Sequence, residues 1–435
     1  MKIVRLLLKL VLLVLVLLIL FALYVFFRPT GPEPVAPISG APTNLTSTLA
    51  RGEYLTRAAD CTACHSVPGG QPYAGGVPFK MPFGTIYSTN ITADKTHGIG
   101  AWSDDEFVRA VRQGISPHGN LYPAMSYTSY TGMSRDDVLA IKAYLFSLPI
   151  SDQANHPGLG FPFNQRWGIK LWNLFFFKDH RIVVDDSKSA DWNRGAYLST
   201  ALGHCGECHT ERNLAFAMKS GKFLGGEDIQ GWHAANITSD KKTGIGDWTD
   251  QQLKEYLTLG HASGRSSASG PMAEVVENSL QYLTPSDIDA MVVYLRSVKP
   301  VSGKQNSIVN LTPQPALSST AILPALSSIQ ANDLGQQIFA NECAGCHQWN
   351  GKGRQTPYAD LVGSRVVNDP QGHSVVQVIL KGTKLKVGDQ EHAMPSFANT
   401  HSDAEIAAVA NYVVGQFGDK KGEVTEKLVA KQRGL

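Results

Sequence analysis

The sequence contains one five-residue pattern, Cys-x-x-Cys-His, three times. Two cysteines at this spacing can form thioethers with the two vinyl groups of a haem, and the histidine that follows can then ligate the iron. The pattern uses all six cysteines of the chain. We therefore expect three covalent c-type haems, bound through Cys61, Cys64, Cys205, Cys208, Cys343 and Cys346, with His65, His209 and His347 as iron ligands.

Other uses of paired cysteines fit this spacing poorly. A zinc ribbon needs a second ligand pair within about 20 residues, whereas the three copies lie about 140 residues apart. A thioredoxin-like motif would occur once, without the fixed histidine. Disulfides are possible in an exported protein, but they do not explain a histidine after every second cysteine.

Length and charge agree with this interpretation. A chain of 435 residues predicts roughly three domains, which matches the three copies of the motif. The net charge of +2 creates no strong field directed at nucleic acid, so we expect no nucleic-acid partner.

The first thirty residues predict a transmembrane helix. No charged residue occurs from Leu10 to Phe27, and at about 1.5 Å per residue this run nearly spans a hydrocarbon core. Lys2, Arg5 and Lys9 precede the run. By the positive-inside rule the N-terminus lies in the cytoplasm of a bacterium, and the rest of the chain lies beyond the inner membrane, in the periplasm.

A cleaved signal peptide is the alternative. Its apolar core is normally about 7–15 residues long and ends at a cleavage site of small residues. Here Phe26, Phe27, Arg28 and Pro29 follow, which is a poor cleavage site, so we favour an uncleaved anchor. Both alternatives place the cysteine motifs in the periplasm, where c-type haems are attached.

Internal repeats divide the remainder of the chain. Arg-Gly opens the first two repeats at Arg51 and Arg194, and Leu334-Gly335 opens a looser third. The first two also share an Asn-Ile-Thr block, at residues 90–92 and 236–238, followed by Gly-Ile-Gly, a tryptophan and a helical pattern. The third repeat lacks this insert.

Each repeat ends with a predicted amphipathic helix. A hydroxyl residue followed three positions later by an acid marks each start, at Ser134, Thr284 and Ser402. The predicted helix bodies cover residues 138–148, 288–298 and 406–414 and carry Tyr144, Tyr294 and Tyr412 on their apolar sides, which we interpret as core. No strand pattern of any length is evident, so the repeats are expected to be mainly α with long loops.

The sixth iron ligand determines whether a haem transfers electrons or binds small molecules. Met125, Met272 and Met394 lie at equivalent places, in proline-bearing loops before each closing helix. A lone methionine is usually core filler, but three in register favour iron ligation. Met81 is the alternative in the first repeat. The remaining candidates are less favoured: Met133, Met218 and Met291 are interpreted as packing, and His118, His204, His261 and His392 as surface or loop residues.

These motifs resemble the three-haem cytochrome c subunit of bacterial membrane-bound alcohol, aldehyde and gluconate dehydrogenases. The matching stretches are residues 61–65, 82–92, 121–125, 203–209, 270–276 and 394–395. The resemblance implies a mainly α fold of three class I cytochrome c domains in tandem behind an N-terminal transmembrane helix. It also implies that the iron ligands are His65 with Met125, His209 with Met272 and His347 with Met394.

The expected divisions follow from the repeats and the resemblance. They are an anchor over 1–30, a Pro-rich tether over 31–48, a first domain over 49–150, an aromatic interdomain segment over 151–190, a second domain over 191–300, a linker over 301–330, a third domain over 331–418 and a charged tail over 419–435. The Ser/Pro-rich linker is expected to let the third domain sit apart. The aromatic run 167–177 is interpreted as interdomain packing, with a partner protein or the bilayer as alternatives.

As the resemblance implies, the chain is not an enzyme on its own. A separate catalytic subunit (a quinoprotein, flavoprotein or molybdoprotein) oxidises the substrate, and electrons pass through this chain to ubiquinone or the terminal oxidase branch. Two alternatives remain open: the cytochrome subunit of a molybdenum hydroxylase that oxidises aldehydes or N-heterocycles, and a multihaem peroxidase-like enzyme. Family members often anchor through their C-terminal region, whereas residues 423–435 here are charged and could at most lie on a membrane surface.

Overall fold

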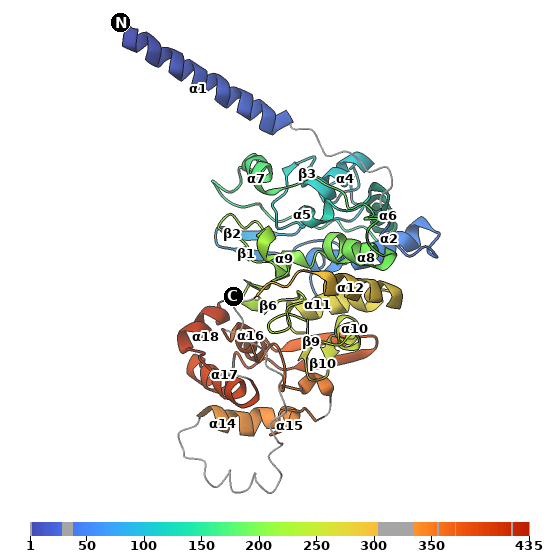
Figure 1. Cartoon of the computed structure of the whole chain (residues 1–435), viewed down its shortest axis with the longest axis vertical. Helices are drawn as coiled ribbons and strands as arrows, with labels where there is room; N and C mark the ends of the chain where they lie inside the picture. The colour runs from blue at the N-terminus through green and yellow to red at the C-terminus, as the bar shows by residue number, and fades with distance from the viewer. Residues whose placement is uncertain are drawn as a thin grey trace.

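The computed structural model describes residues 2–27, 38–302, 334–354, 356–369, 371–418 and 421–434. Over these ranges the chain is mostly helical, as expected. One long helix, α1 (Lys2–Phe27), projects from a body that contains all the other elements (Figure 1). Residues 31–37 of the predicted tether and nearly all of the predicted linker lie outside the described residues.

The strands form short two-stranded antiparallel hairpins. In the described ranges each strand has two to five residues, which is too short for an alternating pattern to be recognised in a sequence. This explains why the sequence predicted no strands. The pairs are β1 (Pro78–Met81) with β2 (Gly84–Tyr87), β3 (Ile115–Ser116) with β4 (Gly119–Asn120), β5 (Glu227–Ile229) with β6 (Trp232–Ala234), β7 (His261–Ala262) with β8 (Ser266–Ser267), and β9 (Thr383–Val387) with β10 (Gln390–Met394).

The helices follow the order of the repeats. The first repeat contains α2 (Thr48–Ala58), α3 (Cys61–His65), α4 (Asp104–Gln113), α5 (Tyr127–Tyr130) and α6 (Arg135–Ser147), and α7 (Gly168–Phe176) follows it. The second contains α8 (Ala190–Ala196), the π-helical turn η1 (Tyr197–Leu202), α9 (Gly206–His209), η2 (Ser220–Lys222), α10 (Asp250–Leu259), α11 (Pro271–Asn278), η3 (Leu280–Tyr282) and α12 (Pro285–Ser297). The third contains α14 (Leu334–Ile338), the π-helical turn η4 (Phe339–Cys343), α15 (Ala344–His347), η5 (Pro357–Ala359), α16 (His373–Lys381), α17 (Asp403–Phe417) and α18 (Glu426–Arg433).

The three predicted closing helices are confirmed as α6, α12 and α17. The side chains of Ser134, Thr284 and Ser402 accept hydrogen bonds from the backbone N–H three residues later, as the predicted caps require. At Ser402 the acid at the third position, Glu405, bonds back to the cap and completes a capping box. These caps fix where each closing helix begins.

The opening helix of each repeat packs against the closing helix at very close range. The contacts pair α2 with α6, α8 with α12 and α14 with α17. At each crossing a glycine faces a backbone carbonyl, and a methyl group in its place would overlap that oxygen. The glycine–carbonyl pairs are Gly52 with Ala140, Gly195 with Ala290 and Gly335 with Ala408. Tyr144, Tyr294 and Tyr412 lie beside the same crossings, so the repeated glycines and tyrosines share one packing role.

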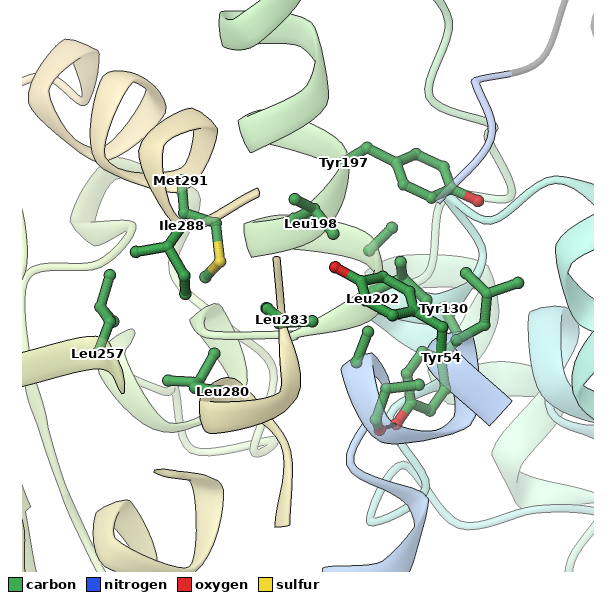
Figure 2. Close-up of a cluster of buried hydrophobic side chains, with 14 of the residues drawn as sticks. Tyr54, Tyr130, Tyr197, Leu198, Leu202, Leu257, Leu280, Leu283, Ile288 and Met291 are labelled. Carbon is green, nitrogen blue, oxygen red and sulfur yellow. Dashed lines mark hydrogen bonds between the residues drawn. The ribbon is translucent and has the colours of Figure 1, made fainter. Parts of the chain in front are cut away.

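The first two repeats share a single hydrophobic core, which Leu385 of the third repeat also joins, and the third repeat has a second core of its own. Figure 2 shows part of the shared core, in which Leu198 of η1 lies on the side of Ile288 and Met291 of α12, and Leu202 of η1 lies on the side of Tyr54 and Tyr130 of the first repeat. Met133 and Met291 are fully buried, which confirms their prediction as packing residues. The first two repeats are therefore fused through apolar contacts.

Reciprocal hydrogen bonds reinforce this fusion. Tyr54 of the first repeat donates its hydroxyl to Asp287 of the second, and Tyr197 of the second donates to Asp137 of the first at 2.8 Å. The same carboxylates pair with arginines of their own repeats, Asp137 with Arg51 and Asp287 with Arg194. Both carboxylates are buried, and each accepts from a charged and a neutral donor. These donors compensate for the water that each carboxylate loses on burial.

The third repeat does not sit apart from the second, and that expectation was wrong. Gln281 of the second repeat donates to the Lys386 carbonyl at 2.9 Å, and Tyr358 of the third donates its hydroxyl to the Leu259 carbonyl at 2.6 Å. The linker composition indicated a long connection, but it carried no information about the surfaces that the connection brings together.

The predicted charged tail contains a packed helix. Residues 426–433 form α18, which packs on α16 and α17 of the third repeat. Val429 and Gln432 are buried there, and Gln377 donates to the Gln432 carbonyl at 3.1 Å. An isolated pair of buried residues among many charges gives too weak a helical pattern to be recognised in the sequence.

The close crossing predicts that Gly195→Ala is destabilising. The added methyl group has to push α8 away from α12, so the free energy of unfolding should fall by about 1–3 kcal/mol. Chemical unfolding followed by circular dichroism measures this change. Gly221→Ala is the matched control, because a methyl group added there meets no other part of the chain within 4 Å, and equal losses in both variants would contradict the packing argument.

Candidate haem-binding sites

Each Cys-x-x-Cys-His motif lies on a short helix, and each histidine is held in the same way. The Nδ1 atom of His65 lies 2.7 Å from the Thr89 carbonyl oxygen. The corresponding distances are 2.6 Å from His209 to Ala235 and 2.7 Å from His347 to Ala359. Because Nδ1 donates to a carbonyl in all three, the proton is fixed there and Nε2 keeps its lone pair for a metal.

The Asn-Ile-Thr blocks build the loops that carry two of these carbonyls. Thr89 and Ala235 directly precede the blocks. Asn90 accepts a hydrogen bond from the Thr92 N–H at 2.9 Å and donates to the Ser151 carbonyl at 2.8 Å. Asn236 makes the equivalent bonds with Thr238, at 2.9 Å, and Val301, at 2.7 Å. The repetition was visible in the sequence, but its role in positioning the histidines was not.

The third repeat supplies its carbonyl differently. Ala359 ends η5, a turn whose first hydrogen bond comes from the Tyr358 N–H to the Thr356 side chain. In place of the missing insert, this shorter turn provides the carbonyl to which the histidine donates.

The protonation states fit iron ligation. Burial lowers the pKa of His209 to about 4, and it lowers the pKa of His65 and His347 as well, so all three imidazoles are neutral at pH 7. Burial raises the pKa of the Cys61 and Cys205 thiols to about 12. All six cysteines are free of disulfides. Each motif therefore offers two thiols and one imidazole nitrogen, a set that fits one haem.

The structure places the predicted methionine ligands beside the two cores. Met125 and Met272 are half-buried against the shared core, and Met394 is half-buried against the third-repeat core. Met272 lies at the start of α11, and Met394 ends β10. The alternative, Met81, ends β1 and pairs with Gly84 in a hairpin. The assignment of all three methionines as iron ligands stays a prediction.

The less favoured histidines have aromatic neighbours. His204 meets the Tyr130 ring edge-on at 5.4 Å, and His392 stacks on the Tyr358 ring at 3.8 Å. His261 lies 5.2 Å from the same tyrosine, and His118 is exposed. Tyr358 thus joins histidines of the second and third repeats.

The first and second motifs meet at the interface of their repeats. Tyr130 of the first repeat donates to the Ala59 carbonyl, two residues before Cys61, and its ring contacts His204, directly before Cys205. Helix α11, which carries Met272, contacts α3 of the first motif. One interface therefore holds parts of both candidate sites.

Arg365 carries a positive charge from the third repeat into the second. Its Nη1 donates to the carbonyls of Asn236, at 3.1 Å, and Thr243, at 3.2 Å, and its Nη2 donates to Gly244. Its guanidinium also lies 5.3 Å from the Trp248 ring centroid. Burial lowers the pKa of Arg365 to about 10, which still leaves it charged at pH 7.

This charge bears on the second candidate site. Asn236, which accepts from Arg365, follows Ala235, whose carbonyl holds His209. Within the described ranges no carboxylate forms an ion pair with Arg365. The third repeat thus contributes an uncompensated cation to the loop behind His209.

Comparisons with known proteins agree with this geometry. The cytochrome c family model matches residues 333–416. The chain is 38% identical over 401 residues to the fructose dehydrogenase cytochrome subunit of Gluconobacter japonicus, covering 88% of this chain and 82% of that relative. It is 36% identical over 403 residues to the gluconate 2-dehydrogenase cytochrome c subunit of Pantoea cypripedii, covering 88% and 89%.

The chain belongs to the cytochrome c subunits of bacterial dehydrogenases. Proteins of this family are electron-transfer subunits of dehydrogenase complexes, not the catalytic subunits, and they carry covalent haem c. A further relative, one of the subunits of the nicotinate dehydrogenase of Pseudomonas putida, is 36% identical over 379 residues, which cover 86% of this chain but 30% of that protein.

Arg365 should raise the reduction potential of the second cytochrome centre, because a nearby cation disfavours the ferric state. A unit charge about 10 Å from an iron, at an effective dielectric of about 20, shifts the potential by on the order of 70 mV. We expect Arg365→Gln to lower one midpoint potential by tens of millivolts and Arg365→Lys to restore most of it, as measured by spectroelectrochemistry.

Arg265→Gln is the matched control, since Arg265 lies over the same Trp248 ring at 5.9 Å but donates to the Asp247 carbonyl instead. Unchanged potentials in Arg365→Gln would show that Arg365 has no electrostatic role, and an equal shift in the control would show that the effect is not specific to Arg365.

Proposed function

We propose that this chain is a membrane-anchored, periplasmic three-haem cytochrome c. In this proposal it takes electrons from a catalytic dehydrogenase subunit and passes them to ubiquinone or to the terminal oxidase branch. The observation that carries the proposal is the threefold imidazole–carbonyl hydrogen bond, which leaves one Nε2 atom for iron beside each pair of thiols. A haem bound at each pair would supply one-electron chemistry.

The same proposal assigns three tandem class I cytochrome c domains, over residues 49–150, 191–300 and 331–418. Three equivalent crossings of an opening and a closing helix support it. The shared core of the first two domains would bring their centres together, and the contacts of Tyr358 and Arg365 would bring the third alongside the second. Electrons could then pass among the centres within one chain.

The proposed anchor is α1, uncleaved, with its N-terminus in the cytoplasm. Among the described residues it is the helix that is long and apolar enough to cross a membrane, over Ile3–Val25. A signal sequence near the N-terminus would share these properties. The poor cleavage site after Phe27 and the three preceding cations favour the anchor in this orientation.

The proposed partner is a catalytic dehydrogenase subunit, because relatives of this chain serve fructose and gluconate dehydrogenases. The second candidate is the cytochrome of a molybdenum hydroxylase, for which the likeness to part of a nicotinate dehydrogenase is the supporting observation. Purification of this chain from membranes under mild detergent, with mass spectrometry of what accompanies it, tests both. A sugar, alcohol or sugar-acid dehydrogenase supports the first, and a molybdenum-containing hydroxylase supports the second.

The proposed methionine ligands predict closed iron centres. Carbon monoxide should bind the reduced protein slowly or not at all, because a thioether occupies each sixth position. Met394→Ala should open one centre and give rapid binding, seen as a shift of the Soret band. Met125→Ala and Met272→Ala should each do the same.

Met218→Ala is the control, since Met218 is predicted to be a packing residue. Rapid binding in the unaltered protein would favour the peroxidase-like alternative. If Met81→Ala opens the first centre and Met125→Ala does not, Met81 is the ligand there.

A further inference from the structure

Helix α7 presents an apolar stripe away from the protein body. Three apolar side chains lie at intervals of four residues on one side of the helix: Trp167, directly before its start, Leu171 and Phe175. Their exposed fractions are 56%, 37% and 69%. The other side is fixed to the body. Trp172 donates its indole N–H to the Ala215 carbonyl at 2.7 Å, and Asn173 accepts from the Tyr127 hydroxyl at 2.7 Å. The stripe is therefore exposed although the helix is firmly held.

Aromatic side chains of neighbouring segments extend the stripe into a patch. Phe163 stacks on Phe83 at 4.8 Å, and Phe216 meets the same ring edge-on at 6.0 Å. Phe163 and Phe216 are both exposed, and so is Leu214, which neighbours the Ala215 that Trp172 of α7 bonds. An exposed apolar surface built from three chain segments needs a partner, because isolated apolar side chains are common on surfaces but contiguous patches are not.

The position of α7 indicates which partner this is. The membrane-spanning candidate α1 contacts α7, and Val25 near the end of α1 is buried. Figure 1 shows α7 on the side of the body that faces α1. The patch thus lies where a bilayer crossed by α1 would meet the body.

The composition of this region also suits lipid headgroups. From Pro157 to Lys178 the sequence contains three basic residues, Arg166, Lys170 and Lys178, and no acidic residue. Tryptophan and phenylalanine with flanking cations are typical of segments that lie in the interface of anionic bilayers.

We propose that the patch of α7, Phe163, Leu214 and Phe216 is a lipid-binding face that sits in the headgroup region of the membrane entered by α1. The face holds the first two cytochrome domains against the bilayer. This inference rests on the proposed membrane anchoring. A docking site for the catalytic subunit is the competing use of the same surface.

Site-directed spin labelling of the full, haem-loaded chain tests the proposal. Its six natural cysteines are consumed by thioethers in the proposed haem centres, so a new cysteine at Phe175→Cys can be labelled alone. The chain is reconstituted into vesicles of phosphatidylcholine and phosphatidylglycerol. We expect relaxation of the label by lipid-soluble oxygen to exceed relaxation by a water-soluble nickel chelate several-fold.

Val293→Cys is the matched control, an apolar position of α12 that is 40% exposed, where the nickel chelate should dominate. Leu171→Cys provides a second label on the stripe if Phe175→Cys does not fold. Vesicle flotation tests the membrane anchor separately from the lipid-binding face. A chain that does not float contradicts the anchor, whereas a chain that floats with a water-accessible label at both stripe positions contradicts the lipid-binding face.

Addition of the purified catalytic subunit distinguishes the competing use. If the label at position 175 becomes shielded from the nickel chelate only when that subunit is added, the patch is a protein-docking surface and the proposal is overturned. Shielding in vesicles without the catalytic subunit supports the proposal.

Discussion

One hydrogen bond, from a histidine ring to a backbone carbonyl, organises each candidate centre. It fixes the imidazole tautomer, so that Nε2 keeps its lone pair for an iron. The surrounding structure serves this bond. In the first two repeats a buried asparagine clamps the loop that supplies the carbonyl, and in the third a short turn does so. Backbone segments of different structure thus make the same hydrogen bond to the histidine.

The arrangement of the repeats follows from two kinds of contact. The first and second share a core and exchange Tyr–Asp hydrogen bonds, so they behave as one folded body. The third keeps its own core and docks through the buried Leu385 and through polar contacts, of which Arg365 is the most consequential because it binds the loop behind His209. Docking of the third repeat therefore places a positive charge at the loop behind His209, and under the proposed function this charge would help to grade the potentials along the electron path.

Local patterns in the sequence predicted much of this structure. The capped closing helices and the apolar first helix are short-range signals, and each lies where it was predicted. The role of Gly195 was not predictable, because its need for a bare backbone arises only when α12 crosses it. The docking of the third repeat and the packing of α18 depend on complementary surfaces formed by residues far apart in the chain. The composition of the chain does not indicate which of these surfaces fit together. The aromatic run of α7 was interpreted as interdomain packing, and only half of it packs: Trp172 does, while Phe175 is exposed.

The most direct test of this account is the intact mass of the mature chain purified from membranes. The account predicts the mass of the uncleaved polypeptide plus three haems, attached through peptides that contain residues 61–65, 205–209 and 343–347. A mature chain without added porphyrin, or with one of these peptides unmodified, would contradict it.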